Sequence, residues 1–218
     1  LDCVSGLTRE DRVLFLVSGG GSALFEKPLI APEELADITR QLLACGADIT
    51  EINTLRKRFS AVKGGRFAQR CAPARVLSIL LSDVLGDPPD MIASGPAYPD
   101  STTCAQAMEI AERYGLRLSD DARRCLSMET PKALSNVETR ITGSVRQLCA
   151  SAERVCAALG YEPVFLTDRL SCEAREAGSF LGSVVRTHAG GGRKLAYIAG
   201  GETPWRIAGE VLKTYIIC

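Results

Sequence analysis

The residues best suited to chemistry begin with a glycine-rich run, Ser18-Gly19-Gly20-Gly21-Ser22, which directly follows an apolar segment. Three consecutive glycines let the backbone turn several N–H groups inward as a nest for an anion, and the two serine hydroxyls add further donors. The run is not a Walker A loop, because it lacks the final Gly-Lys-Ser/Thr, and Leu24 excludes the GxGxxG dinucleotide fingerprint. The run therefore predicts a site for a phosphate or a carboxylate, and a tight strand-to-helix turn without a ligand is the alternative.

A second group of polar residues follows one face of a helix that we expect over residues 48–62. This segment places apolar side chains at helical spacing, and a polar stripe lies one step round the helix from them. The stripe consists of Asn53, Arg56, Ser60 and Lys63. Arginine offers a planar fork to a carboxylate and lysine a point charge to a phosphate, so the stripe is a candidate pocket wall. The alternative is a solvated basic face around Arg56-Lys57-Arg58.

Glycines beside these cations favour the pocket. The step Lys63-Gly64-Gly65-Arg66 permits close approach of the backbone to a ligand. We therefore predict that Gly64, Gly65 and Arg66 bind substrate or phosphate, and that Arg56 and Lys63 are catalytic.

Carboxylates follow another apolar run, in the segment Ser82-Asp83-Val84-Leu85-Gly86-Asp87-Pro88. Oxygen ligands in a loop shaped by glycine and proline suit Mg²⁺, or they orient a substrate hydroxyl. We predict Asp83 as a catalytic group and metal ligand, with Asp87 as the second ligand. Both are also ordinary turn and capping residues. Further substrate-binding or phosphate-binding candidates are Ser94, Gly95, Gly201, Glu202 and Thr203.

The elements that must position these residues alternate between compact apolar runs and longer amphipathic segments. We expect strands at residues 12–17, 76–81, 163–167 and 194–199, and a weaker one at 139–142. We expect helices at residues 32–45, 48–62, 103–114, 120–128, 144–159 and 172–188. This alternation predicts an α/β fold, a doubly wound and mostly parallel sheet with helices on both faces. Ligands of such folds bind at the carboxyl ends of strands, where three of the polar segments fall.

The run Gly190-Gly191-Gly192 is the best candidate for a domain joint, since flexible glycines without apolar partners are typical of linkers. We expect an α/β domain over residues 1–190 and the truncated start of a second domain over 191–218. Leu1 is not a start methionine, which favours an upstream segment that this sequence lacks.

Composition excludes several classes of function. The 26 basic and 26 acidic residues balance, so no nucleic-acid or membrane-surface partner is indicated. Nine cysteines without CxxC spacing favour free buried thiols and a cytoplasmic location. No apolar run is long enough to span a membrane. With a single histidine, His188, neither Ser-His-Asp catalysis nor a histidine-based zinc site is supported.

Several motifs together resemble the class II glycerate 2-kinases, which are often labelled hydroxypyruvate reductases. They lie, in order, at residues 14–24, 51–57, 63–66, 82–88 and 92–96, with further matches at 143–144, 167–169 and 200–203. The resemblance implies phosphoryl transfer from ATP to the 2-hydroxyl of D-glycerate with Mg²⁺, in a cleft between an α/β domain and a C-terminal domain. It implies phosphate binding by the glycine-rich run, and substrate or phosphate contacts by Asn53, Arg56 and Lys63.

The sequence also departs from this family. Arg58 stands where the family usually has histidine, and Val145 where it usually has asparagine. The segment that normally follows Gly-Gly-Glu-Thr is replaced by residues 204–218, so we expect most of the C-terminal domain to be missing. Two alternatives remain open, an NAD(P)H-dependent hydroxypyruvate reductase and an inactive anion-binding fragment. The oligomeric state is also open.

Overall fold

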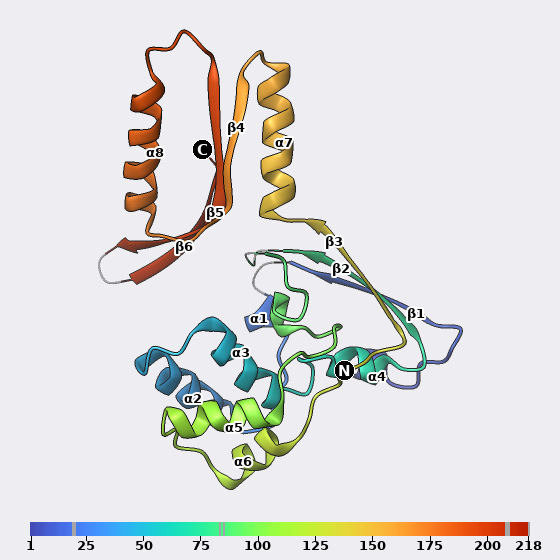
Figure 1. The fold of residues 1–218 in the computed structure, drawn as a ribbon. Helices are drawn as coiled ribbons and strands as arrows, with labels where there is room; N and C mark the ends of the chain where they lie inside the picture. Colours follow the sequence, from blue (N-terminus) through green and yellow to red (C-terminus); the bar gives the residue numbers. More distant parts are fainter. Residues whose placement is uncertain (19–20, 83, 85, 208–209, 218) are drawn as a thin grey trace. The chain divides into compact units, whose positions relative to one another are not determined.

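The computed structural model describes residues 1–18, 21–82, 84, 86–207 and 210–217, with side chains described up to residue 202. The chain divides into two compact units, one formed by Leu1–Leu81 with Pro88–Thr142 and the other by Ser82–Asp87 with Gly143–Cys218. Each unit contains one three-stranded sheet (Figure 1). The domain boundary predicted at residues 190/191 differs from this division, because it falls inside the second unit.

The sheet of the first unit has the order β1-β2-β3, formed by β1 (Arg12–Val17), β2 (Arg75–Leu81) and β3 (Val137–Gly143). β1 and β2 are parallel, and backbone hydrogen bonds from Val76 to Asn136 and from Ser82 to Gly143 show that β3 runs in the same direction. Burial alternates along β2, as expected where one face of a sheet packs on a core. The weak strand predicted at residues 139–142 is thus a full member of this sheet.

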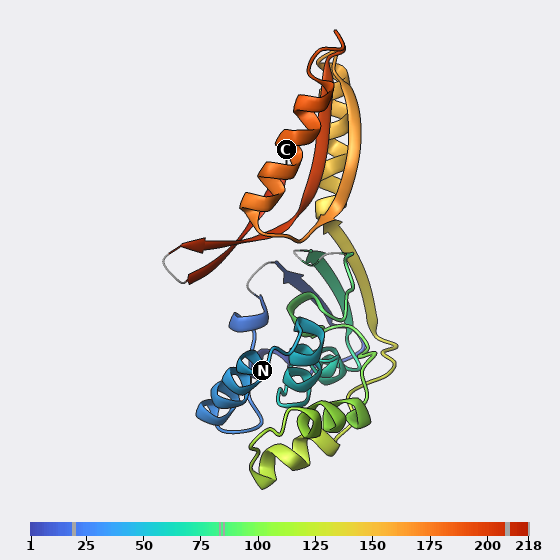
Figure 2. The same ribbon diagram turned by 60° about the vertical axis from the view of Figure 1, so that its left-hand side comes forward.

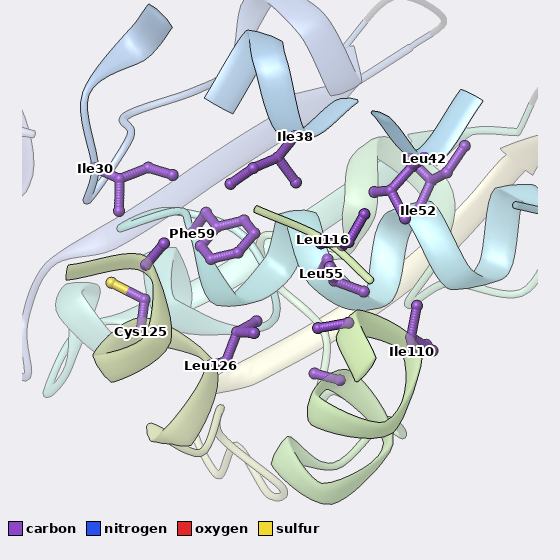
Figure 3. Packing of buried hydrophobic residues seen from close by; sticks show 13 residues of the cluster. Ile30, Ile38, Leu42, Ile52, Leu55, Phe59, Ile110, Leu116, Cys125 and Leu126 are labelled. Carbon is purple, nitrogen blue, oxygen red and sulfur yellow. The ribbon is translucent and has the colours of Figure 1, made fainter. Parts of the chain in front are cut away.

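Four helices of the first unit enclose a core of their own: α2 (Pro32–Ala44), α3 (Ile49–Arg58), α5 (Cys104–Arg113) and α6 (Asp120–Ser127). Figures 1 and 2 both show these helices grouped together. Each helix turns an apolar stripe inward, and Figure 3 shows side chains such as Ile38, Leu55 and Phe59 meeting at the centre. This helical cluster carries Asn53 and Arg56, so its packing fixes half of the predicted polar stripe.

A second core of the first unit lies between the sheet and α4 (Arg66–Cys71). Phe67 of α4 and Val76 of β2 are buried there, and Phe15 and Phe25 pack against them. The ring centroids of Phe15 and Phe67 are 4.5 Å apart, within the range of favourable aromatic pairs. This core holds β1 and the segment around Phe25 against the rest of the unit.

The helix predicted at residues 48–62 is shorter than expected. Its start is confirmed, because Asp48 and Glu51 form a reciprocal capping box. However, the helix ends at Arg58, and Ser60 instead pairs with Pro28 in an isolated β-bridge. The physical reason is Arg66, whose Nη1 donates to the carbonyl oxygens of residues 57, 58 and 60 at 2.6–3.1 Å and so satisfies the end of the helix.

The second unit contains α7 (Val145–Ala158), β4 (Glu162–Leu170), α8 (Ala174–His188), β5 (Leu195–Ile207) and β6 (Glu210–Ile217). Its sheet has the order β4-β5-β6, with β4 and β5 parallel and β6 antiparallel to β5. Figure 1 shows α7 and α8 on opposite sides of β4 and β5. The α/β class with parallel strands and flanking helices is therefore confirmed, although the strands form two sheets and β6 was not predicted.

Gly200 in β5 lies directly against α7. A Cβ atom there would lie 2.5 Å from Cys149 Sγ and 2.6 Å from Val145 Cγ1, both on α7. Gly200→Ala is therefore expected to push α7 away and to cost about 1–3 kcal/mol of unfolding free energy. Chemical denaturation followed by circular dichroism measures this. The matched control is Gly178→Ala, since no atom lies within 4 Å of a Cβ at Gly178.

Two expectations about composition can be compared with the fold. The eight cysteines in the described residues are free thiols, as expected, although only Cys71, Cys125 and Cys149 are buried. None of the described helices is long and apolar enough to cross a membrane.

Candidate active site

The end of the glycine-rich run begins a single helical turn, α1 (Gly21–Leu24). Gly19 and Gly20 lie outside the described residues. The Gly21 N–H donates to the Ser18 carbonyl oxygen at 3.2 Å. A Cβ at Gly21 would lie 3.0 Å from the Cβ of Ala93, so α1 packs directly on the 3-10 turn η2 (Ile92–Ser94). Glycine at position 21 thus permits a close approach of two backbone segments.

Two cations of the predicted stripe meet at the Ser22 carbonyl oxygen. Arg56 Nη2 donates to this oxygen at 3.0 Å, and Lys63 Nζ donates to it at 2.8 Å. The carbonyl lies in the last turn of α1, where helix geometry leaves such oxygens without a partner in the helix. The structure therefore brings Arg56 and Lys63 to the glycine-rich run, although only Arg56 lies on a helix.

Lys63 is completely buried, and its Nζ also donates to the Ala93 carbonyl oxygen at 3.2 Å. Glu26 Oε2 lies 3.7 Å away and forms an ion pair with it. Burial lowers the pKa of Lys63 to about 8, because the carboxylate of Glu26 offsets the loss of water only in part and the guanidinium of Arg56 opposes the charge. Lys63 is therefore mostly protonated below about pH 8 and mostly neutral above it.

Glu26 is a site residue that sequence reasoning missed. Its Oε1 accepts a very short hydrogen bond from the Ser60 hydroxyl, and its Oε2 is buried with no hydrogen-bond partner among the described residues. Its side chain is 14% exposed. No periodic pattern points to Glu26, because it lies in a connecting segment. Ser60 donates its hydroxyl to this carboxylate, and its predicted role in substrate binding stays a prediction.

The predicted ligand-binding glycines Gly64, Gly65 and Gly95 lie where two backbone segments touch. The Gly64 and Gly65 N–H groups donate to the carbonyl oxygens of Ser94 and Gly95 at 3.0 and 2.7 Å. Asn53 Oδ1 accepts from the Ser94 hydroxyl at 3.0 Å, and both side chains are buried. These contacts give the glycines a packing role and hold η2 beside Lys63.

The alternative of a solvated basic face does not hold for Lys57 and Arg58. Lys57 and Arg58 are completely buried, and both form ion pairs with the buried carboxylate of Asp100, at 3.0 and 3.7 Å. Arg58 Nη1 also donates to the Thr130 hydroxyl at 2.9 Å. Arg66 donates to the carbonyl oxygens at the end of α3, and burial lowers its pKa. Its predicted role in phosphate binding stays a prediction. These three cations organise the fold beside the site.

The predicted metal ligands are only partly described. Asp83 lies outside the described residues, as does Leu85. Asp87 has a positive φ of 55° and belongs to the second unit, where its N–H donates to the Val84 carbonyl oxygen at 3.1 Å. Its carboxylate is an oxygen ligand of the kind that hard cations take. Within the described part of the chain, however, no three His, Cys, Asp or Glu side chains form a group that could hold a metal ion.

The remaining candidates belong to β5 of the second unit. Gly201 is paired with Leu170 of β4, and a Cβ there would overlap the Leu170 backbone, so glycine is required for this close pairing. Glu202 is partly buried. The side chain of Thr203 lies outside the described residues. Their role as ligand contacts stays a prediction.

Both the sequence and the fold of the chain match known proteins. Residues 1–127 match the family described as "Domain of unknown function (DUF4147)", and the chain belongs to it. The chain is similar to the D-glycerate 2-kinase of Thermotoga maritima, with 47% identity over 216 residues, covering 96% of this chain and 52% of the relative. It is also similar to a protein of Agrobacterium vitis named "Putative hydroxypyruvate reductase", with 38% identity, 92% of this chain covered and 48% of the relative.

A solved structure shares the fold. A crystal structure of glycerate kinase from Thermotoga maritima superimposes with a TM-score of 0.87 and 46% identity, covering 96% of this chain and 52% of that chain. The expected resemblance to glycerate 2-kinases is thus confirmed. The chain spans about half the length of the relatives it matches.

Proposed function

We propose that the chain is part of an ATP-dependent kinase that phosphorylates the 2-hydroxyl of D-glycerate and yields 2-phosphoglycerate. The observation that carries this proposal is the convergence of Arg56 and Lys63 on the carbonyl oxygen of Ser22, the last residue of the glycine-rich run. Phosphoryl transfer requires mainly that anions are positioned and their charge neutralised, so such a site needs no histidine base. The name of the Thermotoga maritima relative supports glycerate as the acceptor.

Arg56 is the side chain best placed to hold an anion. It is only partly buried, and a guanidinium has donors beyond the one that binds the Ser22 carbonyl oxygen. Its planar fork fits the carboxylate of glycerate or a phosphate in two-point contact. The glycine-rich run would supply backbone N–H groups to the same anion.

We further propose that ATP is used together with Mg²⁺, and that Asp83 and Asp87 are the candidate ligands. A bound Mg²⁺ would neutralise phosphate charge, which a kinase site needs. The chain's own residues contribute orientation: Arg56 binds the anion, and the buried contacts of Lys63 fix the segments beside it.

The test is phosphoryl transfer by the purified protein with D-glycerate, ATP and MgCl₂, followed by ³¹P NMR. The expected result is a new phosphomonoester signal coupled to the proton on carbon 2, together with ADP, in an amount that depends on glycerate. Binding of ATP and glycerate without ADP release would instead support an anion-binding protein.

A hydroxypyruvate reductase is the second candidate, because the Agrobacterium vitis relative carries that name. The same preparation is therefore given hydroxypyruvate with NADH or NADPH. We expect no oxidation of the nucleotide, since the sequence lacks a dinucleotide fingerprint. Hydroxypyruvate-dependent oxidation without glycerate phosphorylation would replace the kinase proposal.

A further inference from the structure

The donors of Lys63 are all directed at protein atoms. An ammonium has three N–H donors. Those of Lys63 face the Ser22 carbonyl oxygen at 2.8 Å, the Ala93 carbonyl oxygen at 3.2 Å and Glu26 Oε2 at 3.7 Å. The side chain is completely buried. Two donors are thus hydrogen-bonded to backbone carbonyl oxygens, and the ammonium faces the Glu26 carboxylate at ion-pair distance, which suits a positioning role better than the catalytic role expected from the sequence.

The two carbonyl oxygens that Lys63 joins belong to different segments. Ser22 lies in α1, at the end of the glycine-rich run, and Ala93 lies in η2 with a positive φ of 51°. A non-glycine residue adopts this conformation only where surrounding contacts hold it. The ammonium therefore ties α1 to η2, at the place where Gly21 and Ala93 touch.

Glu26 completes this arrangement as the charged neighbour of the ammonium. Its carboxylate is anchored through Oε1 by the Ser60 hydroxyl, while Oε2 has Lys63 as its charged neighbour. A buried cation without a nearby anion would lose its proton or leave the interior. The carboxylate thus keeps Lys63 charged and in place, against the opposing charge of Arg56.

We propose that Lys63 and Glu26 are a pair of positioning residues that fix the end of the glycine-rich run against η2, and that Arg56 alone of these three binds the anionic substrate. The kinetic consequences of this assignment rest on the proposed kinase function. Its structural consequence, the anchoring of α1, is independent of that function and is measured separately.

The first measurement is hydrogen–deuterium exchange of the segment that contains α1. Lys63→Met replaces the ammonium with an apolar chain of similar length, and we expect exchange in α1 to rise roughly tenfold as local opening becomes easier. The control is Lys27→Met, an exposed lysine close by in the sequence, which is expected to leave exchange unchanged. Unchanged exchange in folded Lys63→Met would overturn the proposal, whether or not the protein is a kinase.

Lys63→Met leaves the buried carboxylate of Glu26 without a cation, which is a risk to folding. The double variant Lys63→Met/Glu26→Gln removes both charges. We expect it to fold and to show the same faster exchange in α1 as Lys63→Met. If α1 exchanged hydrogen for deuterium at the same rate in the double variant as in the original protein, the anchoring role would be contradicted.

The second measurement separates positioning from substrate contact. In steady-state kinetics, Lys63→Met is expected to lower kcat about 100-fold with little change in KM for glycerate, because it displaces groups without removing a contact. Arg56→Met is expected to raise KM about tenfold or more. A rise in KM without loss of kcat in Lys63→Met would identify Lys63 as a substrate contact and refute the assignment.

The third measurement uses the pH profile of kcat. The groups that face Lys63 are Glu26 and Arg56, and its pKa is lowered to about 8. Activity that needs the ammonium is present below this pH and lost above it. Glu26→Gln removes the favourable charge, so the alkaline limb is expected to move down by about one unit. An alkaline limb that stays in place would refute the role of Glu26.

The two proposals can also fail separately. If the original protein lacks kinase activity but hydrogen–deuterium exchange in α1 is faster in Lys63→Met, the proposed kinase function is rejected and the anchoring of α1 by Lys63 is retained.

Discussion

Asp100→Asn is expected to destabilise the protein by about 3–5 kcal/mol, because it leaves two buried cations without their shared carboxylate. Lys57 and Arg58 are completely buried, and Asp100 lies between them with no exposed side-chain surface. The asparagine has nearly the same shape, so the loss reports charge rather than volume. Urea denaturation followed by circular dichroism measures the unfolding free energy.

The control for this prediction is Asp37→Asn. Asp37 forms an ion pair with Arg40, but both side chains are exposed, and such pairs contribute little. The urea midpoint is therefore expected to stay unchanged. Equal effects of the two substitutions would contradict the structural role assigned to the buried carboxylate of Asp100.

The pH dependence of this effect has a definite sign. Burial alone would raise the pKa of Asp100, but the Lys57 ammonium and hydrogen bonds from Thr130 and Thr102 outweigh it and hold the pKa below its ordinary value of 3.8. The stability that the carboxylate contributes is thus fully present above pH 3.8 and is lost as the pH falls through the lowered pKa. The difference between the original protein and Asp100→Asn should shrink under acid conditions.

Local signals in the sequence predicted much of the fold. The capping box of Asp48 and Glu51 and the periodicity of the later helices placed the start of α3 and the bounds of α2, α5 and α6 to within one or two residues. Capping and amphipathic spacing are properties of neighbouring residues, so they can be recognised from the sequence alone. The apolar runs likewise located β1, β2, β4 and the first part of β5.

Features set by distant residues were not predictable in this way. The helix that starts at Asp48 ends early because Arg66 binds its last carbonyl oxygens, and Arg58 is buried because Asp100 lies beside it. Nothing in the spacing of the basic residues distinguishes this network from a solvated face. For the same reason Glu26 was missed as the partner of Lys63, whereas the polar stripe predicted from helical spacing did include Arg56, which the structure brings to the glycine-rich run.

Gly95 shows why glycines of a motif need not bind a ligand. Its φ is 63°, and a Cβ there would lie 2.8 Å from the Asp90 carbonyl oxygen. Asp90 in turn forms an ion pair with Lys57 at 3.3 Å. A side chain at position 95 would therefore displace the backbone that carries part of the buried ion network, in addition to the strain of a left-handed conformation.

Gly95→Ala is accordingly expected to cost about 2–5 kcal/mol of unfolding free energy, combining about 1–2 kcal/mol for the left-handed backbone with 1–3 kcal/mol for overpacking. The matched control is Gly115→Ala, where φ is 58° but no atom lies within 4 Å of a Cβ. This variant is expected to show only the conformational cost, about 1–2 kcal/mol. The difference between the two variants in urea denaturation isolates the clash with Asp90. If Gly95→Ala were no worse than Gly115→Ala, Gly95 would be free of this packing constraint, and its predicted role as a ligand contact would regain support.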